Sequence, residues 1–167
     1  MKGDVMVSKR IRLLITVVLL LNSGCAFAAS KPHEPPPRFK EILQGSLTVG
    51  QFDTETLKYE RDSYRNELVV NVWIKTKPDE NNGRYSLNHY LFRVNEREYM
   101  LLDLIQYNNL VGNITYHKSN IYDMTLWTKI IPETEVENWY VPVLKYVQAN
   151  DKKLKNQYNK QLTSEFH

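Results

Sequence analysis

Cysteine, glycine and catalytic signature motifs are scarce in this chain, and each absence excludes a class of protein. The 167 residues include one cysteine, Cys25, which excludes an intramolecular disulfide and any metal site built from several thiolates. The six glycines follow no repeat, so the chain is neither collagen-like nor a glycine-rich linker. Phosphate-binding loops, dinucleotide fingerprints, nucleophile elbows and zinc-protease motifs do not occur, and no cofactor is predicted.

Histidine and carboxylate positions add no metal or catalytic site. The chain contains four histidines: His33, His89, His117 and His167. None has a second ligand at the helical spacing of known metal motifs. Acidic residues such as Asp103 and Glu137 are isolated in the pattern, so no carboxylate pair for general acid–base catalysis is indicated. We therefore predict no metal and no enzymatic activity, and an uncharacterised hydrolase ranks last among the functions considered.

The first 28 residues have the three parts of an export signal. A basic segment precedes an apolar run at residues 13–21, which is too short to cross a bilayer as a helix. Ala26-Phe27-Ala28 follows in the A-x-A form that signal peptidase accepts, which predicts cleavage near Ala28. The segment ending in Cys25 also resembles a bacterial lipobox. Two forms stay open: a soluble exported protein (periplasmic, on the outer surface or secreted), and a protein anchored to the membrane by lipidation of Cys25.

Loss of this signal would change the charge balance of the chain. The whole sequence has 22 basic and 19 acidic side chains, a formal net charge of +3. Four of the basic residues and one of the acids lie in residues 1–28, which leaves 18 of each sign. A chain without net positive charge lacks the overall attraction that drives nucleic-acid binding, so no nucleic-acid partner is predicted.

Alternating apolar and polar residues predict β-strands from Phe39 onward. The clearest alternation spans residues 66–77, and its more polar face carries Val69, Asn71, Trp73 and Lys75. The expected strands are residues 47–52, 56–60, 66–77, 84–94, 98–107 and 113–118. Turn formers separate these segments, and the Asn82-Gly83 pair favours a positive φ. Consecutive strands joined by short loops indicate an antiparallel β-meander sheet of about five to six strands.

A helix is predicted to follow the strands. Thr134 and Glu137 fit a capping box, in which each side chain bonds a free backbone N–H near the other. One helical face then carries Val136, Tyr140, Val143, Leu144 and Val147. Pro142 conflicts with an uninterrupted helix, so we expect a kink there or a restart with Pro142 in the first turn. The predicted fold class is α+β: the antiparallel sheet with this C-terminal α-helix packed on it.

The chain divides into four predicted segments. They are a signal peptide at 1–28, a proline-rich linker at 29–40, an α+β domain at 41–150 and a polar, helical or frayed tail at 151–167. The linker is either an extended spacer or a plain disordered terminus. In the tail, apolar residues repeat every four positions among lysines. This pattern fits a basic amphipathic helix for a partner or a membrane, and it also fits a solvated helical extension that frays.

Five segments share their order and spacing with a known protein family. They are Val72-Trp73-Ile74-Lys75, residues 85–90, residues 97–102, Tyr107-Asn108 with Gly112-Asn113-Ile114, and residues 127–132 followed by Thr134 and 140–146. Together, across residues 47–149, they resemble the surface-adhesin protein E family. The resemblance implies a small exported α+β domain, without a catalytic residue, that binds extracellular-matrix proteins of a host. Many members of that family carry a cysteine pair between a strand and the helix. The corresponding residues here are Val94 and Val147, so the resemblance implies a helix held by packing alone.

Aromatic side chains give the strongest binding signal in the sequence. The chain has eleven tyrosines and three tryptophans, residue types that favour interfaces because they bury a large area with little loss of rotamer entropy. In a regular meander the polar face of residues 66–77 would continue onto neighbouring strands through some of His89, Arg93 and Asp103. The predicted binding residues are Trp73, Lys75, His89 and Arg93. The alternative is that the helix covers one face and Trp73 packs beneath a loop.

These observations lead to two main hypotheses about function. The first is an exported, non-enzymatic binding module of the cell envelope or surface, an adhesin-like protein whose partner is another protein. The second is a periplasmic or lipid-anchored accessory protein that docks on another envelope component. Exposed edge strands would also allow two copies of the chain to pair as a homodimer.

Overall fold

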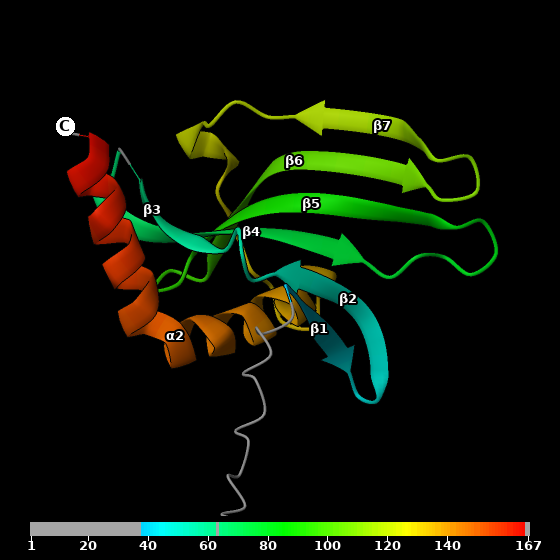
Figure 1. The fold of residues 1–167 in the computed structure, drawn as a ribbon, viewed down its shortest axis with the longest axis horizontal. Helices are drawn as coiled ribbons and strands as arrows, with labels where there is room; N and C mark the ends of the chain where they lie inside the picture. Colours follow the sequence, from blue (N-terminus) through cyan, green and yellow to red (C-terminus); the bar gives the residue numbers. More distant parts are fainter. Residues whose placement is uncertain (1–37, 63, 166–167) are drawn as a thin grey trace, which may run out of the picture. The chain divides into compact units, whose positions relative to one another are not determined.

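The computed structural model describes residues 38–62 and 64–165. The predicted signal peptide, Cys25 and most of the proline-rich linker lie outside these residues. The described chain folds as a curled antiparallel sheet with the long C-terminal helix α2 (Glu135–Glu165) packed on it (Figure 1). The predicted α+β fold class is therefore confirmed.

The sheet contains eight strands within the described residues. They are β1 (Phe39–Gln44), β2 (Leu47–Asp53), β3 (Lys58–Asp62), β4 (Glu67–Thr76), β5 (Arg84–Arg93), β6 (Glu98–Asn108), β7 (Asn113–Ser119) and β8 (Thr128–Lys129). A short 3₁₀ helix, η1 (Met124–Leu126), precedes β8. The strand order is β1-β2-β4-β5-β6-β7, with β3 beside β4 and β8 beside β6. All these pairings are antiparallel.

Strands β4 to β7 form the predicted meander, in which each strand lies beside the next one in the chain. Between β4 and β5, Gly83 has a φ of +63°, as predicted from the Asn-Gly pair. The meander does not extend to the earlier strands, because β2 and β3 share one edge of β4. Strand β1 is absent from the predicted strands. The strand buries one residue, Ile42, and therefore has no alternation of apolar and polar side chains by which the sequence could reveal it.

Helix α2 covers one face of the sheet and forms the main core with it. The sheet contributes Val70, Val72 and Ile74 of β4 and Tyr90 and Phe92 of β5. The helix contributes Trp139, Tyr140, Val143, Val147 and Leu154, each at most 4% exposed. The Tyr140 hydroxyl also donates a hydrogen bond of 3.1 Å to the backbone carbonyl of Val94. The helix therefore lies on the apolar face of β4, opposite the face that carries Trp73.

The start of α2 contains the predicted capping interactions. Thr134 Oγ1 accepts a hydrogen bond of 3.4 Å from the Glu137 N–H, and Glu137 Oε2 accepts one of 2.8 Å from the Glu133 N–H. The helix then continues through Pro142. It does not restart there, which was one of the two predicted alternatives. The sharp bend of the ribbon lies further along the helix, in its deeper orange part (Figure 1).

The predicted boundary between domain and tail, at residue 150, falls inside α2. Leu154, which lies beyond that boundary, is 4% exposed and belongs to the main core. Residues 151–165 therefore continue the helix, and Leu154 fastens this part of α2 to the sheet.

A loop covers one end of the opposite face of the sheet. Val69, Leu91 and Met100 are buried there in a second apolar cluster, and Trp127 packs against them. Residues 120–127 supply the loop and η1. Trp73 is not part of this cluster and is partly exposed.

Gly50→Ala tests the close packing of α2 on β2. A Cβ at this position would lie 2.8 Å from the Trp139 ring and 2.8 Å from the Lys75 carbonyl oxygen, so the ring or the strand must move. We expect the free energy of unfolding to fall by about 1–3 kcal/mol in urea denaturation, as for other overpacked cores. The control is Ser46→Ala in the exposed turn, expected to change it by less than about 0.5 kcal/mol. A Gly50→Ala protein as stable as the wild type would contradict this packing.

Candidate functional site

The open part of the second face is built around Trp73 and His89. Trp73 of β4 lies opposite His89 of β5, and their rings stack with centroids 4.5 Å apart and planes 11° apart. Asp103 of β6 lies opposite His89 in turn. A register shift in β6 places Leu102 between the pairs Tyr90–Leu101 and His89–Asp103. The register thus brings Trp73, His89 and Asp103 onto one face, as the alternation predicted.

A chain of hydrogen bonds holds the His89 ring in place. Nδ1 lies 3.0 Å from Asp103 Oδ2, and Nε2 lies 2.8 Å from Asn71 Oδ1. The Asn71 amide nitrogen donates to Glu60 Oε2 at 2.7 Å, which orients its oxygen toward the ring. Both ring nitrogens therefore face side-chain oxygens, one on each neighbouring strand. The ring presents one flat surface to Trp73 and keeps its polar atoms within the sheet.

Asp103 receives hydrogen bonds from two neighbouring strands. Ser119 of β7 donates to its Oδ1, and His117 Nε2 lies 3.7 Å from the same oxygen. Burial alone would raise the pKa of Asp103, but the bonds from Ser119 and His89 hold it below its usual range.

The meeting of serine, histidine and aspartate here does not form a nucleophilic triad. The Ser119 hydroxyl bonds the Asp103 carboxylate. His89 Nε2, the ring nitrogen that does not face Asp103, bonds Asn71 instead of a hydroxyl. A nucleophile needs its hydroxyl bonded to the base, and that bond is missing. Although His89 and His117 flank Asp103, the described residues contain no group of three or more such side chains that could hold a metal ion.

Lys75 extends the same face with a second aromatic group. Its ammonium lies 4.4 Å from the centroid of the Tyr85 ring, within the range of a cation–π interaction. Tyr85 of β5 stacks on Tyr107 of β6, with centroids 5.2 Å apart and planes 8° apart. Trp73, His89, Lys75, Tyr85 and Tyr107 are all partly exposed. We call these five residues the open face.

Arg93 is not available on this face, which corrects its place among the predicted binding residues. Its side chain is 1% exposed and forms ion pairs with Asp62, with Glu67 at 2.7 Å and with Glu98 at 3.3 Å. The Trp127 ring lies 3.9 Å from the guanidinium carbon. Strand alternation places Arg93 on the correct face, but it does not reveal that residues 120–127 cover that end.

Two of the carboxylates around Arg93, those of Asp62 and Glu98, have lowered pKa values. Burial alone would raise the pKa of Asp62, but hydrogen bonds from Arg93, Tyr122 and two backbone amides lower it. A hydrogen bond from Lys129, at 3.0 Å, lowers the pKa of Glu98, and Arg93 adds to this effect. The cluster therefore links β3, β4, β5, β6 and β8 through one buried cation.

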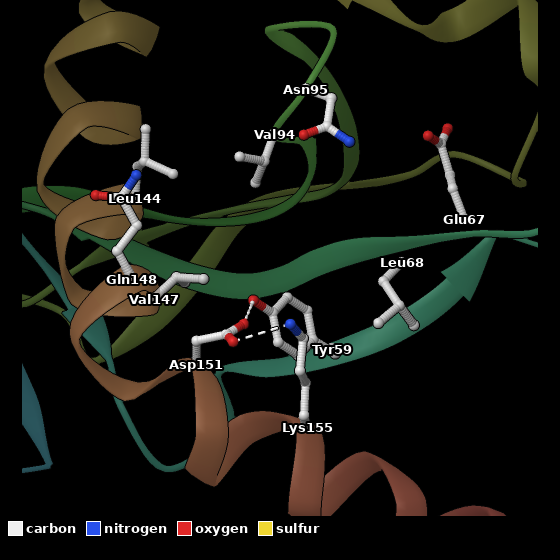
Figure 2. Close-up of a pocket in the computed structure, with 10 residues that line it drawn as sticks. All are labelled: Tyr59, Glu67, Leu68, Val94, Asn95, Leu144, Val147, Gln148, Asp151 and Lys155. Carbon is white, nitrogen blue, oxygen red and sulfur yellow. Dashed lines mark hydrogen bonds and ion pairs between the residues drawn. The ribbon is translucent and has the colours of Figure 1, made fainter.

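A groove lies between α2 and the sheet (Figure 2). Because Tyr59 lies opposite Val70, the groove is on the face that α2 covers and not on the open face. It has a volume of about 520 Å³, and its apolar lining is Tyr59, Leu68, Val94, Leu144 and Val147. The sequence did not predict this groove, because it depends on β3 lying beside α2. Val94 and Val147, the residues that correspond to the cysteine pair of the resembled family, both line the groove.

Three polar groups of the groove are bonded to one another: those of Tyr59, Asp151 and Lys155. The Tyr59 hydroxyl donates to Asp151 at 2.7 Å, and Lys155 pairs with the other carboxylate oxygen at 2.9 Å (Figure 2). These bonds lower the pKa of Asp151, and burial together with the Asp151 bond raises that of Tyr59. The polar end of the groove thus fastens β3 to α2.

Comparisons of the chain with protein-family models, curated proteins and solved structures find no match. In the described part of the chain, no helix has the length and apolar character needed to span a bilayer.

Arg93→Met tests the role of the buried cation. The methionine would fill much of the space but leave Asp62, Glu67 and Glu98 without their shared partner. We expect the free energy of unfolding to fall by about 3–5 kcal/mol, the usual cost of breaking a buried ion pair. Urea denaturation measures this loss. Arg97→Met, which removes a half-exposed arginine paired with Glu137, is the matched control and should cost less than about 1 kcal/mol. Equal losses in the two variants would contradict the assigned role.

The free energy of unfolding should fall in acid, because protonation removes the charge of bonded carboxylates in the fold. The pKa values of Asp62, Glu98 and Asp103 are lower in the fold than in the unfolded chain. Their contribution to stability is complete above the unfolded pKa values, which are about 4, and is lost as the pH falls toward the folded values. The urea midpoint should therefore decrease steadily below about pH 5. A midpoint that stays constant from pH 7 to pH 3 would contradict this coupling.

Proposed function

We propose that this chain is an exported, non-enzymatic binding module that holds a protein partner on its open face. The observation that carries the proposal is the pair of aromatic stacks, Trp73 on His89 and Tyr85 on Tyr107, with Lys75 beside them. Trp73 lies on the face opposite α2, belongs to neither apolar cluster and is partly exposed. Aromatic rings of this kind supply much of the binding energy in protein interfaces.

The rigidity of the open face favours binding. His89 is held from both sides by Asn71 and Asp103, and Trp73 stacks on the ring so fixed. A surface that is already ordered loses little side-chain entropy when a partner docks. The same bonds occupy the polar atoms that a hydrolase would need free, which favours recognition over catalysis.

The resemblance to the surface-adhesin protein E family gives the proposal its partner class. An extracellular-matrix protein of a host is the first candidate, and an envelope protein of the producing cell is the alternative. Val94 and Val147 line one groove, as expected if they stand at the positions of the cysteine pair of that family. This supports the resemblance to the family. Export rests on the signal at residues 1–28, with lipidation at Cys25 as the alternative to soluble release.

Pairing of two copies through an edge strand is a separate part of the proposal. Strand β7 ends the sheet, and all seven of its residues are exposed. Unpaired backbone groups on such an edge can bond a strand of a second copy. Sedimentation of the purified chain would distinguish a dimer from a monomer.

Trp73→Ala tests the open face. Binding of the purified protein to immobilised extracellular-matrix proteins, and to purified envelope proteins of the source cells, would be measured by biolayer interferometry. We expect the affinity for the captured partner to fall at least about tenfold, since loss of a central tryptophan commonly has this effect. The urea midpoint would confirm that the variant is folded.

Tyr116→Ala provides the matched control for that experiment. Tyr116 is an exposed aromatic residue of β7, 46% exposed, and its register places it on the other face of the sheet. We expect its affinity to remain within about twofold of the wild type, because residues outside an interface contribute little. Wild-type affinity in Trp73→Ala, or an equal loss in both variants, would contradict the proposed face. Arg93 is unsuitable for this test because its removal would destabilise the fold.

A further inference from the structure

The C-terminal half of α2 has an excess of positive charge, because its four lysines outnumber its two acidic residues, Asp151 and Glu165. Residues 152–164 include four lysines and no aspartate or glutamate. One of the four, Lys155, points to the groove and pairs with Asp151 at 2.9 Å (Figure 2). The other three are exposed, and no acidic side chain of the described residues bonds them: they are Lys152, Lys153 and Lys160.

These three lysines line one shallow surface hollow. Its volume is about 590 Å³, and the amide side chains of Asn150, Asn156 and Gln157 lie among the ammonium groups. Lys160 also lines an adjacent hollow with Lys58 and Glu55. The Glu55 carboxylate is already paired with Arg38 at 3.6 Å, so it does not cancel the positive charge of this surface.

The chemistry of this hollow fits an anion that accepts several hydrogen bonds. Ammonium groups supply charge and the carboxamides supply further N–H donors, a combination that suits sulfate groups. Because the three lysines span roughly 12 Å along the helix, at 1.5 Å per residue, they can contact more than one such group. A polymer with repeated sulfates satisfies this requirement better than a single small ion.

A bilayer fits this surface less well than a polymer. A helix that lies in a membrane surface needs an apolar face directed at the lipid. The apolar face of α2 is already used, because Val147 and Leu154 are buried against the sheet at 3% and 4% exposure. The exposed side of this part of the helix consists of lysines and uncharged polar residues, with Ala149 as the one apolar residue in the hollow.

We propose that the outer surface of α2 at residues 150–160 binds a linear sulfated polysaccharide through Lys152, Lys153 and Lys160. This surface is separate from the open face, and the inference does not depend on the function proposed for Trp73 and His89.

Heparin is the probe that tests this inference. The purified protein would be applied to immobilised heparin, and its affinity measured at several salt concentrations. We expect binding near physiological salt. The logarithm of the affinity should fall linearly with the logarithm of the salt concentration. The variant K152Q/K153Q/K160Q should bind at least about tenfold more weakly and show a shallower salt dependence, because fewer counterions are released. Glutamine preserves helix propensity, and circular dichroism would confirm that α2 is intact.

The control is K77Q/R84Q/K118Q, which removes the same charge from exposed positions outside α2. It should remain within about twofold of the wild type, since a specific site depends on position as well as net charge. Absence of heparin binding, wild-type affinity in the α2 variant or an equal loss in the control would overturn the inference. Binding to phosphatidylglycerol vesicles without binding to heparin would also overturn it, and would assign the surface to an anionic bilayer.

Discussion

The buried guanidinium of Arg93 is the interaction on which the arrangement of this sheet depends. It joins carboxylates from β3, β4 and β6, and Lys129 of β8 completes the cluster through Glu98. A buried cation is costly unless its charge is matched, and here three acidic side chains and the face of Trp127 surround it. Because Trp127 belongs to the segment at residues 120–129, the same cluster also fixes the loop that closes one end of the face.

This closure gives the two faces of the sheet different roles. One face is covered by α2 and supplies the main core. The other is covered at the Arg93 end and open at the end that holds Trp73 and His89. The register shift at Leu102 lies between these two ends, because it separates the pair His89–Asp103 from the pair Tyr90–Leu101. The second apolar cluster and the open face thus occupy opposite ends of the same face of the sheet, and the main core lies on the other face.

Much of the fold follows from local patterns in the sequence. Alternation located the strands from β2 to β7, and Thr134 and Glu137 located the start of α2, because these signals depend on near neighbours in the chain. Alternation also placed Trp73, His89 and Asp103 on one face. It could not show that Arg93 is covered, since that depends on a loop more than twenty residues away in sequence. The groove between β3 and α2 was unpredicted for the same reason: Tyr59 and Asp151 meet only in the tertiary fold.

Oxidative footprinting of the tryptophans tests the central claim, that the open face is the binding surface, most directly. In the free protein Trp73 should be oxidised readily, whereas Trp139, at 3% exposure, should react slowly and serve as an internal reference. When a protein partner is added and binds, oxidation of Trp73 should fall while that of Trp139 stays constant. Unchanged oxidation of Trp73 in the complex, with protection at Tyr59 in the groove instead, would contradict the claim.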